Sequence, residues 1–204
     1  MEELFDFPIM KSGVDELVAD IIKSNYDNRR LIINDEINNN LLESICLYIL
    51  KYNQEDKDVP EDKRKPIWII LNSVGGVVNF GMGLIDCIKH SITPVYCLII
   101  GMAASMGAVL LASGEKGKRY ATPNAEILIH QPLIAGGGLS GQTTEIKIHA
   151  DHMVKTREKL NKLLSDRTGQ SLETIQRDTE RDNYMTAEEA LKYGLIDGIM
   201  DKRK

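Results

Sequence analysis

Ser105 is the first of three residues whose types and surroundings suit nucleophilic catalysis. It stands in the segment GMAASMGA, residues 101–108, among small side chains and directly before an apolar stretch that predicts a helix. Small neighbours permit a sharp strand-to-helix turn that exposes a serine hydroxyl, although the pattern is A-x-S-x-G rather than G-x-S-x-G. Serine is also a favoured helix N-cap, so the turn by itself leaves catalysis and capping both open.

His130 is the candidate base. It follows the apolar run ILI at 127–129, and the proline at 132 stops this strand from continuing in the middle of a sheet. Open α/β sheets bind ligands at the carboxyl ends of their parallel strands, but a histidine there can also be a hydrogen-bonded part of the core. The other histidines lie at a helix end or on a predicted long helix and are weaker candidates: His90, His149 and His152.

An acidic side chain would be needed to orient the histidine, and the segment RDTERD at 177–182 offers two aspartates and a glutamate. Spacing alone does not choose among them.

Gly75 and Gly76 follow another predicted strand, and paired glycines let a backbone approach a ligand with its N–H groups exposed. A simple tight turn fits the same pair, since neither of the usual phosphate-binding glycine patterns is present.

The elements that must position these residues alternate between strand and helix from residue 67 onward. Apolar runs at 67–71, 95–100 and 127–130 predict strands, the first of them buried on both faces. Helices are expected between them, at about 77–91 and 106–113. This order favours an α/β fold with a mainly parallel sheet and right-handed crossovers.

Two segments outside this core are unusual. The charged, proline-containing stretch 53–66 is typical of a solvated surface loop. A glycine run at 136–138 leads into a predicted helix over about 142–167, roughly 39 Å long at 1.5 Å per residue. A small core cannot cover that length, so we expect this helix to project and to pack on another subunit.

The remaining expected elements are short: a helix at 14–23, a strand at 30–33, a helix at 41–52, a helix at 171–180, and a helix from the capping box at 186–189 to Gly194.

Composition excludes several classes of protein. A net charge of −5 and a pI near 5.5 argue against nucleic-acid binding through bulk positive charge. No apolar run approaches the 18 residues needed to span a bilayer, and the acidic start MEELFDFPIM lacks the pattern of a secretory signal. We therefore expect a cytoplasmic protein with no membrane partner.

The three cysteines, Cys46, Cys87 and Cys97, sit in apolar surroundings without the close spacing of a zinc site. Free cysteine is among the most buried residue types, and cytosolic thiols stay reduced. The sequence therefore predicts buried cysteines in a reducing compartment and no metal site.

Taken together, these segments resemble the proteolytic subunits of the Clp protease (ClpP) family. The matching residues are NSVGGVV at 72–78, GMAASMGA at 101–108, GEKGKRYATPNAEILIHQP at 114–132 and GQSLETIQRDTERDNYMTAEEALKYGLID at 169–197. The resemblance implies a crotonase-like α/β fold of repeated β-β-α units, with a projecting handle made of one strand and a long helix. The implied division of the chain is a variable N-terminal segment at 1–28, a head domain at 29–132, the handle at 133–168, and the C-terminal part of the head domain at 169–204.

The resemblance also implies a serine endopeptidase with a Ser-His-Asp triad. Ser105 would be the nucleophile, His130 the general base, and Asp182, the last aspartate of RDTERD, would orient the histidine. The backbone amides of Gly76 and Met106 would form the oxyanion hole. Neither a cofactor nor a metal is implied.

The implied assembly is a barrel of two stacked heptameric rings, a tetradecamer, in which the chain is the proteolytic subunit of an ATP-dependent protease. Its partners would be copies of itself, a ring-shaped AAA+ unfoldase that hydrolyses the ATP, and polypeptide substrates, both unfolded proteins and short peptides. The main alternative is a catalytically silent subunit that assembles with or regulates an active paralogue. A hydratase acting on acyl thioesters is a weaker one, since a fold does not dictate function.

Bound peptide would lie extended along residues 76–78 and 133–135 in the manner of an added strand.

Three features depart from the family pattern. Val74 stands where the family usually has proline, which removes a fixed φ from the glycine turn. The glycine-rich stretch 133–140 is longer than usual, and the N-terminal segment lacks the pattern of the family's axial-pore loops.

Overall fold

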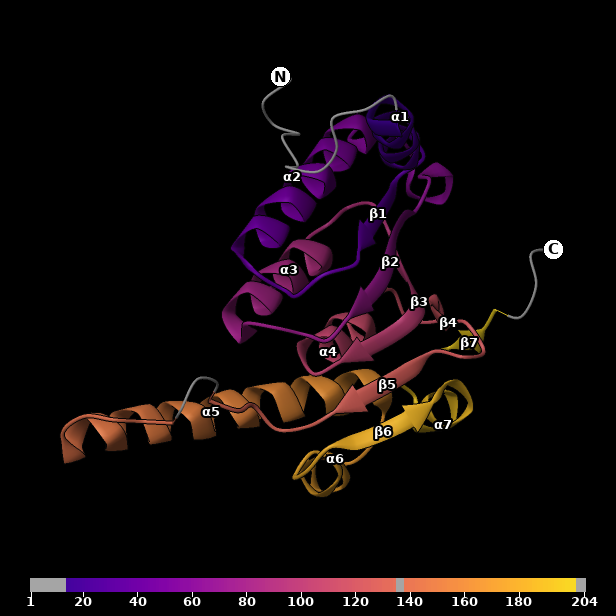
Figure 1. Cartoon of the computed structure of the whole chain (residues 1–204). Coiled ribbons are helices and arrows are strands. Elements are labelled where there is room, and N and C mark those ends of the chain that lie inside the picture. Colours follow the sequence, from indigo (N-terminus) through magenta and orange to yellow (C-terminus); the bar gives the residue numbers. More distant parts are fainter. Residues whose placement is uncertain (1–13, 135–137, 201–204) are drawn as a thin grey trace.

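The structure is a computed structural model that describes residues 14–134 and 138–200, with the backbone alone described at 14–17. Figure 1 shows a body built around a sheet, from which one long helix projects. The first 13 residues of the N-terminal segment and residue 135 of the predicted peptide-binding stretch lie outside the described residues.

One sheet contains the seven strands of the described chain: β1 (Arg30–Ile33), β2 (Ile67–Ser73), β3 (Val95–Ala104), β4 (Arg119–Ala121), β5 (Glu126–Ile129), β6 (Asn183–Thr186) and β7 (Gly198–Ile199). The strand order is β1-β2-β3-β4-β7, while β5 pairs with the far part of β3 and β6 pairs with β5. The β5–β6 pair is antiparallel and the other pairs are parallel. The predicted α/β fold with a mainly parallel sheet is confirmed.

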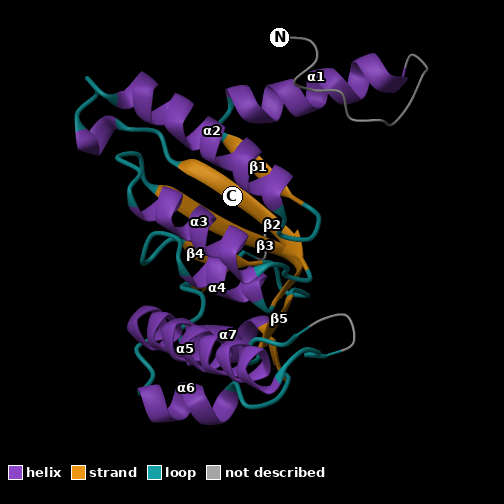
Figure 2. Cartoon of the chain, turned by 90° about the vertical axis from the view of Figure 1, so that its left-hand side faces the viewer, coloured by secondary structure: helices purple, strands orange, loops and turns teal. Residues whose placement is uncertain are grey.

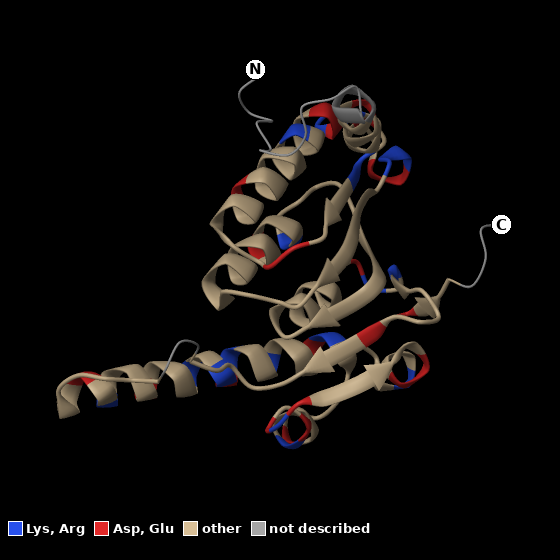
Figure 3. Ribbon diagram, viewed as in Figure 1, with Lys and Arg blue, Asp and Glu red and all other residues tan. Residues whose placement is uncertain are grey.

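Three helices cover one face of this sheet: α2 (Asn39–Asp56), α3 (Val78–Lys89) and α4 (Met106–Ala112) (Figure 2). Along β2 the side chains of alternate residues are buried, and those between them are partly exposed. The expectation that this strand is buried on both faces is therefore wrong. On the face opposite the helices, Trp68 meets Tyr96 edge to face at 5.2 Å and stacks on Tyr120 at 6.0 Å, and all three rings are half-buried. The strands β2 and β3 carry no charged side chain (Figure 3).

The remaining helices are α1 (Val14–Asp27), α5 (Thr143–Thr168), α6 (Leu172–Asp178) and α7 (Ala187–Tyr193). The predicted long helix is confirmed as α5, which begins at a capping box formed by Gln142 and Glu145. Its buried residues all lie near its C-terminal end, so its N-terminal half extends away from the body (Figure 1). Residues 133–134 and 138–142, the described part of the segment before α5, form no strand, in contrast to the strand expected in the handle.

The stretch 53–66 is not simply a surface loop. Helix α2 continues to Asp56, and a 3-10 turn follows at Glu61–Lys63. Asp56 is 4% exposed, and its carboxylate receives a bidentate hydrogen bond from Arg29 at 2.5 and 2.9 Å and accepts the Thr93 hydroxyl at 2.7 Å. The Arg29 guanidinium holds the pKa of this carboxyl below its usual range, because its hydrogen bonds stabilise the charged form. This buried group joins α2 to the loops before β1 and β3.

The cysteine expectation holds for one residue of three. Cys97 is buried and free, but Cys46 of α2 and Cys87 of α3 form a disulfide, with their Cα atoms 6.0 Å apart. Both paired residues are only partly buried. Sequence spacing could not reveal the pair, because it depends on how two amphipathic helices pack side by side.

Candidate active site

Ser105 stands at a strained turn between β3 and α4. Its backbone has φ 55° and ψ −122°, a conformation that L-residues rarely adopt and that costs of order 1–3 kcal/mol. The turn is held from behind, since the Ser105 amide donates to the Leu128 carbonyl at 2.9 Å. The Ser105 side chain makes no helix-capping hydrogen bond, so the N-cap alternative is wrong for its hydroxyl.

The hydroxyl is instead directed at the candidate base. Ser105 Oγ lies 2.8 Å from His130 Nε2, and His130 Nδ1 lies 3.0 Å from Asp182 Oδ1. In the tautomer with its proton on Nδ1, the ring donates to the carboxylate and accepts from the hydroxyl. The His130 side chain is 14% exposed and that of Asp182 is 59% exposed. The three residues predicted from the sequence therefore form one continuous chain of hydrogen bonds.

Strand pairing explains how two residues 52 positions apart meet. The antiparallel register of β5 and β6 pairs Ile129 with Asn183, so His130 and Asp182 follow as the next pair beyond it. The Gln131 amide donates to the Thr179 carbonyl at 2.6 Å, and the Gln131 side chain donates to the Glu180 carbonyl at 2.8 Å. This positioning role of Gln131 was not predicted from the sequence, because it depends on backbone groups that have no sequence signature.

The other acids of the RDTERD segment have different partners. Asp178 accepts from the Tyr193 hydroxyl at 3.0 Å and from Arg177 at 2.8 Å. Glu180 lies 3.6 Å from Arg157 on α5. Asp182 is thus the acid of this segment that contacts the imidazole.

A glycine turn lies against the serine. A Cβ added at Gly75 would come within 2.8 Å of the Ser105 Cβ and 3.0 Å of the Met106 amide nitrogen, so only glycine lets the two segments approach this closely. Gly76 forms an isolated parallel bridge with Ile37, in which the Ile37 amide donates to the Gly75 carbonyl at 2.7 Å. Within the described chain, the amides of Gly76 and Met106 donate no hydrogen bond.

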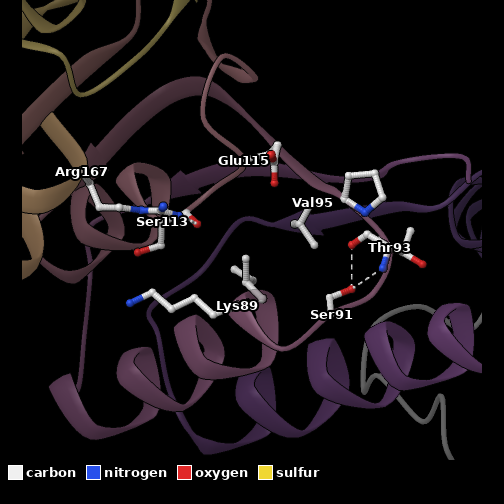
Figure 4. A pocket seen from close by; sticks show the side chains of 9 residues that line it. Lys89, Ser91, Thr93, Val95, Ser113, Glu115 and Arg167 are labelled. Carbon is white, nitrogen blue, oxygen red and sulfur yellow. Dashed lines mark hydrogen bonds between the residues drawn. The ribbon is translucent and has the colours of Figure 1, made fainter. Parts of the chain in front are cut away.

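A hollow of about 470 Å³ adjoins the imidazole and is lined by residues 130–133 and 180–182. A smaller hollow of about 190 Å³ lies at the other end of β3, lined by Lys89, Ser113 and Arg167 among others (Figure 4). There the Arg167 guanidinium donates to the Ala112 and Gly114 carbonyls, each at 3.0 Å, and so caps the end of α4. The first hollow contains the candidate base, whereas the Arg167 and Ser113 side chains at the second form hydrogen bonds with the backbone of α4 and the residues that follow it.

Three further properties of the described residues concern metal ligands, thiol reactivity and membrane insertion. No group of three or more His, Cys, Asp or Glu side chains is arranged there to hold a metal ion. Burial raises the pKa of the free thiol Cys97 to about 12, which makes it a poor nucleophile. No described helix is both long and apolar enough to cross a bilayer.

Residues 13–203 match the protein-family model described as Clp protease, which spans nearly the whole chain. The chain belongs to the Clp protease family. The resemblance inferred from the sequence is thereby confirmed, and the family makes the chain a serine-type protease subunit. Clp protease subunits in general assemble as oligomers and work with an unfoldase partner.

Proposed function

We propose that this Clp protease subunit is an active serine endopeptidase in which Ser105, His130 and Asp182 are the catalytic triad. The observation that carries the proposal is the 2.8 Å contact between Ser105 Oγ and His130 Nε2, with the second ring nitrogen held by Asp182. A serine hydroxyl is a weak nucleophile unless a base takes its proton during attack. This contact supplies the base in the required place.

Acylation begins when Ser105 Oγ attacks the carbonyl carbon of the scissile bond and His130 Nε2 takes the hydroxyl proton. Asp182 stabilises the imidazolium through its hydrogen bond to Nδ1. The carbonyl oxygen becomes an oxyanion and accepts hydrogen bonds from the Gly76 and Met106 amides. The tetrahedral intermediate collapses as His130 donates its proton to the leaving amine, which leaves an acyl ester on Ser105.

Deacylation repeats these steps with water. His130 takes a proton from the water that attacks the ester. As the second tetrahedral intermediate collapses, His130 returns this proton to Ser105 Oγ, which releases the new carboxyl end and restores the hydroxyl. Recognition through backbone hydrogen bonds along residues 76–78 and 133–134 suits an extended peptide of varied sequence. Unfolded proteins and short peptides are therefore the proposed substrates.

We place this activity in a tetradecamer of two stacked heptameric rings. The exposed N-terminal half of α5 supports such an assembly, because a helix of 26 residues that is buried at one end leaves a face for another subunit. A ring-shaped AAA+ unfoldase would hydrolyse ATP and deliver substrates. We propose a cytoplasmic location for the whole complex, a compartment in which a disulfide such as Cys46–Cys87 is unusual.

The rival proposal is a silent subunit whose triad is misaligned, and the continuous hydrogen bonds from Ser105 to Asp182 favour the active enzyme. The test is hydrolysis of a short fluorogenic peptide, with the mass of the particle measured in solution, for the wild type and for Ser105→Ala. The proposal predicts two particles of equal mass, of which only the wild type cleaves the peptide. An assembled wild-type particle without hydrolysis would favour the silent subunit.

A further inference from the structure

Ser73, the last residue of β2, has a buried hydroxyl that joins two loops. The residue is 4% exposed. Its Oγ donates to the Asp35 carbonyl at 2.6 Å and accepts from the Gly75 amide at 3.1 Å. One hydroxyl therefore links the segment after β1 to the glycine turn that precedes α3.

The same segment after β1 holds the glycine turn from its other side. The Ile37 amide donates to the Gly75 carbonyl at 2.7 Å, and the Val77 amide donates to the Ile37 carbonyl at 2.9 Å. These bonds engage the groups on both sides of Gly76 and leave the Gly76 amide itself without an acceptor in the described chain. The position of this amide thus depends on where the segment after β1 lies.

The neighbouring side chain of Asn72 joins the segment after β1 to the end of β2 and to β3. Asn72 donates from Nδ2 to the Asn34 side-chain oxygen at 2.7 Å and accepts the Met102 amide at 3.0 Å. Asn72 is partly exposed at its own end of the network, whereas Ser73 is buried against the nucleophile turn. A Cβ added at Gly107 would lie 3.2 Å from the Ser73 carbonyl, which shows how closely the end of β2 approaches the start of α4.

We propose that Ser73 is a positioning residue for the oxyanion hole, an inference that rests on the proposed triad chemistry. By fixing the Asp35 carbonyl and the Gly75 amide, its hydroxyl sets the direction in which the Gly76 N–H points. This chain needs such a support because Val74, which is 68% exposed, stands in the turn without the fixed φ of a proline. Ser73 touches no reacting atom and acts through Gly76.

The test is Ser73→Ala, with Ser113→Ala as the matched control. Ser113 is also buried, at 1% exposure, and its hydroxyl donates to the Val109 carbonyl at 2.8 Å at the far end of α4 (Figure 4). Both variants therefore lose one buried hydroxyl, but only one of these hydroxyls holds the glycine turn. The measurements are kcat and KM for a short fluorogenic peptide, and the inhibition constant of a peptide aldehyde, whose adduct with Ser105 places an oxygen in the oxyanion hole.

We expect Ser73→Ala to lower kcat at least tenfold relative to Ser113→Ala, with KM within threefold of the wild type. Aldehyde inhibition should weaken by a similar factor, because the adduct and the transition state use the same amide. Ser73→Thr keeps the hydroxyl and should recover most of the lost kcat. A purely structural role would not separate kcat and aldehyde affinity from KM in this way.

Two results would overturn the inference: a Ser73→Ala protein that keeps kcat within threefold of Ser113→Ala, or one that loses its folded assembly while Ser113→Ala keeps it. Failure of the proposed function is a separate result. In that case the wild type itself would show no hydrolysis that depends on Ser105.

Discussion

Gly76→Ala should separate the geometry of the oxyanion hole from the general cost of placing a side chain in a turn. Gly76 has φ +151°, and an added Cβ would clash most closely with the Ile37 carbonyl oxygen and would lie 2.7 Å from the Ile37 amide nitrogen. Ordinary contacts begin near 3.4 Å, so the contact with the Ile37 nitrogen alone requires the glycine turn and the Ile37 backbone to move apart by about 0.7 Å, and the carbonyl oxygen requires more. The Ile37 nitrogen is itself a donor to the turn, so this displacement disturbs the bridge that holds Gly76.

The size of the effect follows from hydrogen-bond geometry. An oxyanion donor works at 2.7–3.1 Å, and removing one typically costs 10²- to 10³-fold in kcat, or about 2.7–4 kcal/mol. A displacement of at least about 0.7 Å takes the Gly76 amide beyond that range. We therefore expect kcat to fall by about 10²-fold while the particle remains assembled.

Gly117→Ala is the matched control. Gly117 also has a positive φ, +86°, but nothing lies within 4 Å of its added Cβ. Both substitutions carry the backbone cost of a side chain at positive φ, about 1–2 kcal/mol, and only Gly76→Ala adds the clash. The assay is peptide hydrolysis together with the thermal midpoint of each variant. Equal kcat values for Gly76→Ala and Gly117→Ala would refute the assignment of Gly76 to the oxyanion hole.

Three further predictions concern the acid of the triad, a buried ion pair and the disulfide. Asp182→Asn should lower kcat for peptide hydrolysis by up to about 10⁴-fold without unfolding the protein. A decrease in kcat of less than tenfold would contradict the role of this carboxylate. Asp56→Asn breaks a buried pair with Arg29 and should lower the free energy of unfolding at pH 7 by about 3 kcal/mol. The pKa of Asp56 is lowered in the folded protein, so the stabilisation by this carboxylate is present above the ordinary aspartate pKa of about 3.9 and is lost as the pH falls below that value. The thermal midpoints of the wild type and Asp56→Asn should therefore converge below this pH. A difference between the two midpoints that stays constant down to pH 3 would contradict this. The disulfide between Cys46 and Cys87 closes a loop of 41 residues, which should stabilise the folded protein by about 4 kcal/mol. Dithiothreitol should therefore lower the thermal midpoint of the wild type but not that of Cys46→Ser. Equal shifts of the two midpoints would contradict the presence of this disulfide.

Most of the helices and the longer strands could be predicted from the sequence, because hydrophobic periodicity determines them. Long apolar runs marked β2 and β3, and the capping box at Thr186 marked the start of α7. The strands β4, β6 and β7 were not predicted. They are two to four residues long, and they form only because neighbouring strands offer them backbone partners.

At the candidate active site, too, some features could be predicted from the sequence and others could not. The residue types at Ser105 and His130 suggested nucleophile and base, but their alternatives, a helix cap and a core histidine, could be weighed only against coordinates. The choice of Asp182 among three acids came from family resemblance, and its contact with the imidazole depends on the β5–β6 register. The segment after β1 was not singled out, because its contribution to the glycine turn comes from the backbone of Asp35 and Ile37.

The proposed activity requires that Ser105 becomes acylated with His130 as its base. The most direct measurement is mass spectrometry of the particle after reaction with a fluorophosphonate probe, with the modified residue located by peptide mapping. We predict one adduct per chain on Ser105, no adduct in Ser105→Ala, and much slower labelling in His130→Ala. An assembled wild-type particle that stays unlabelled, or that carries the probe on another residue, would contradict the account.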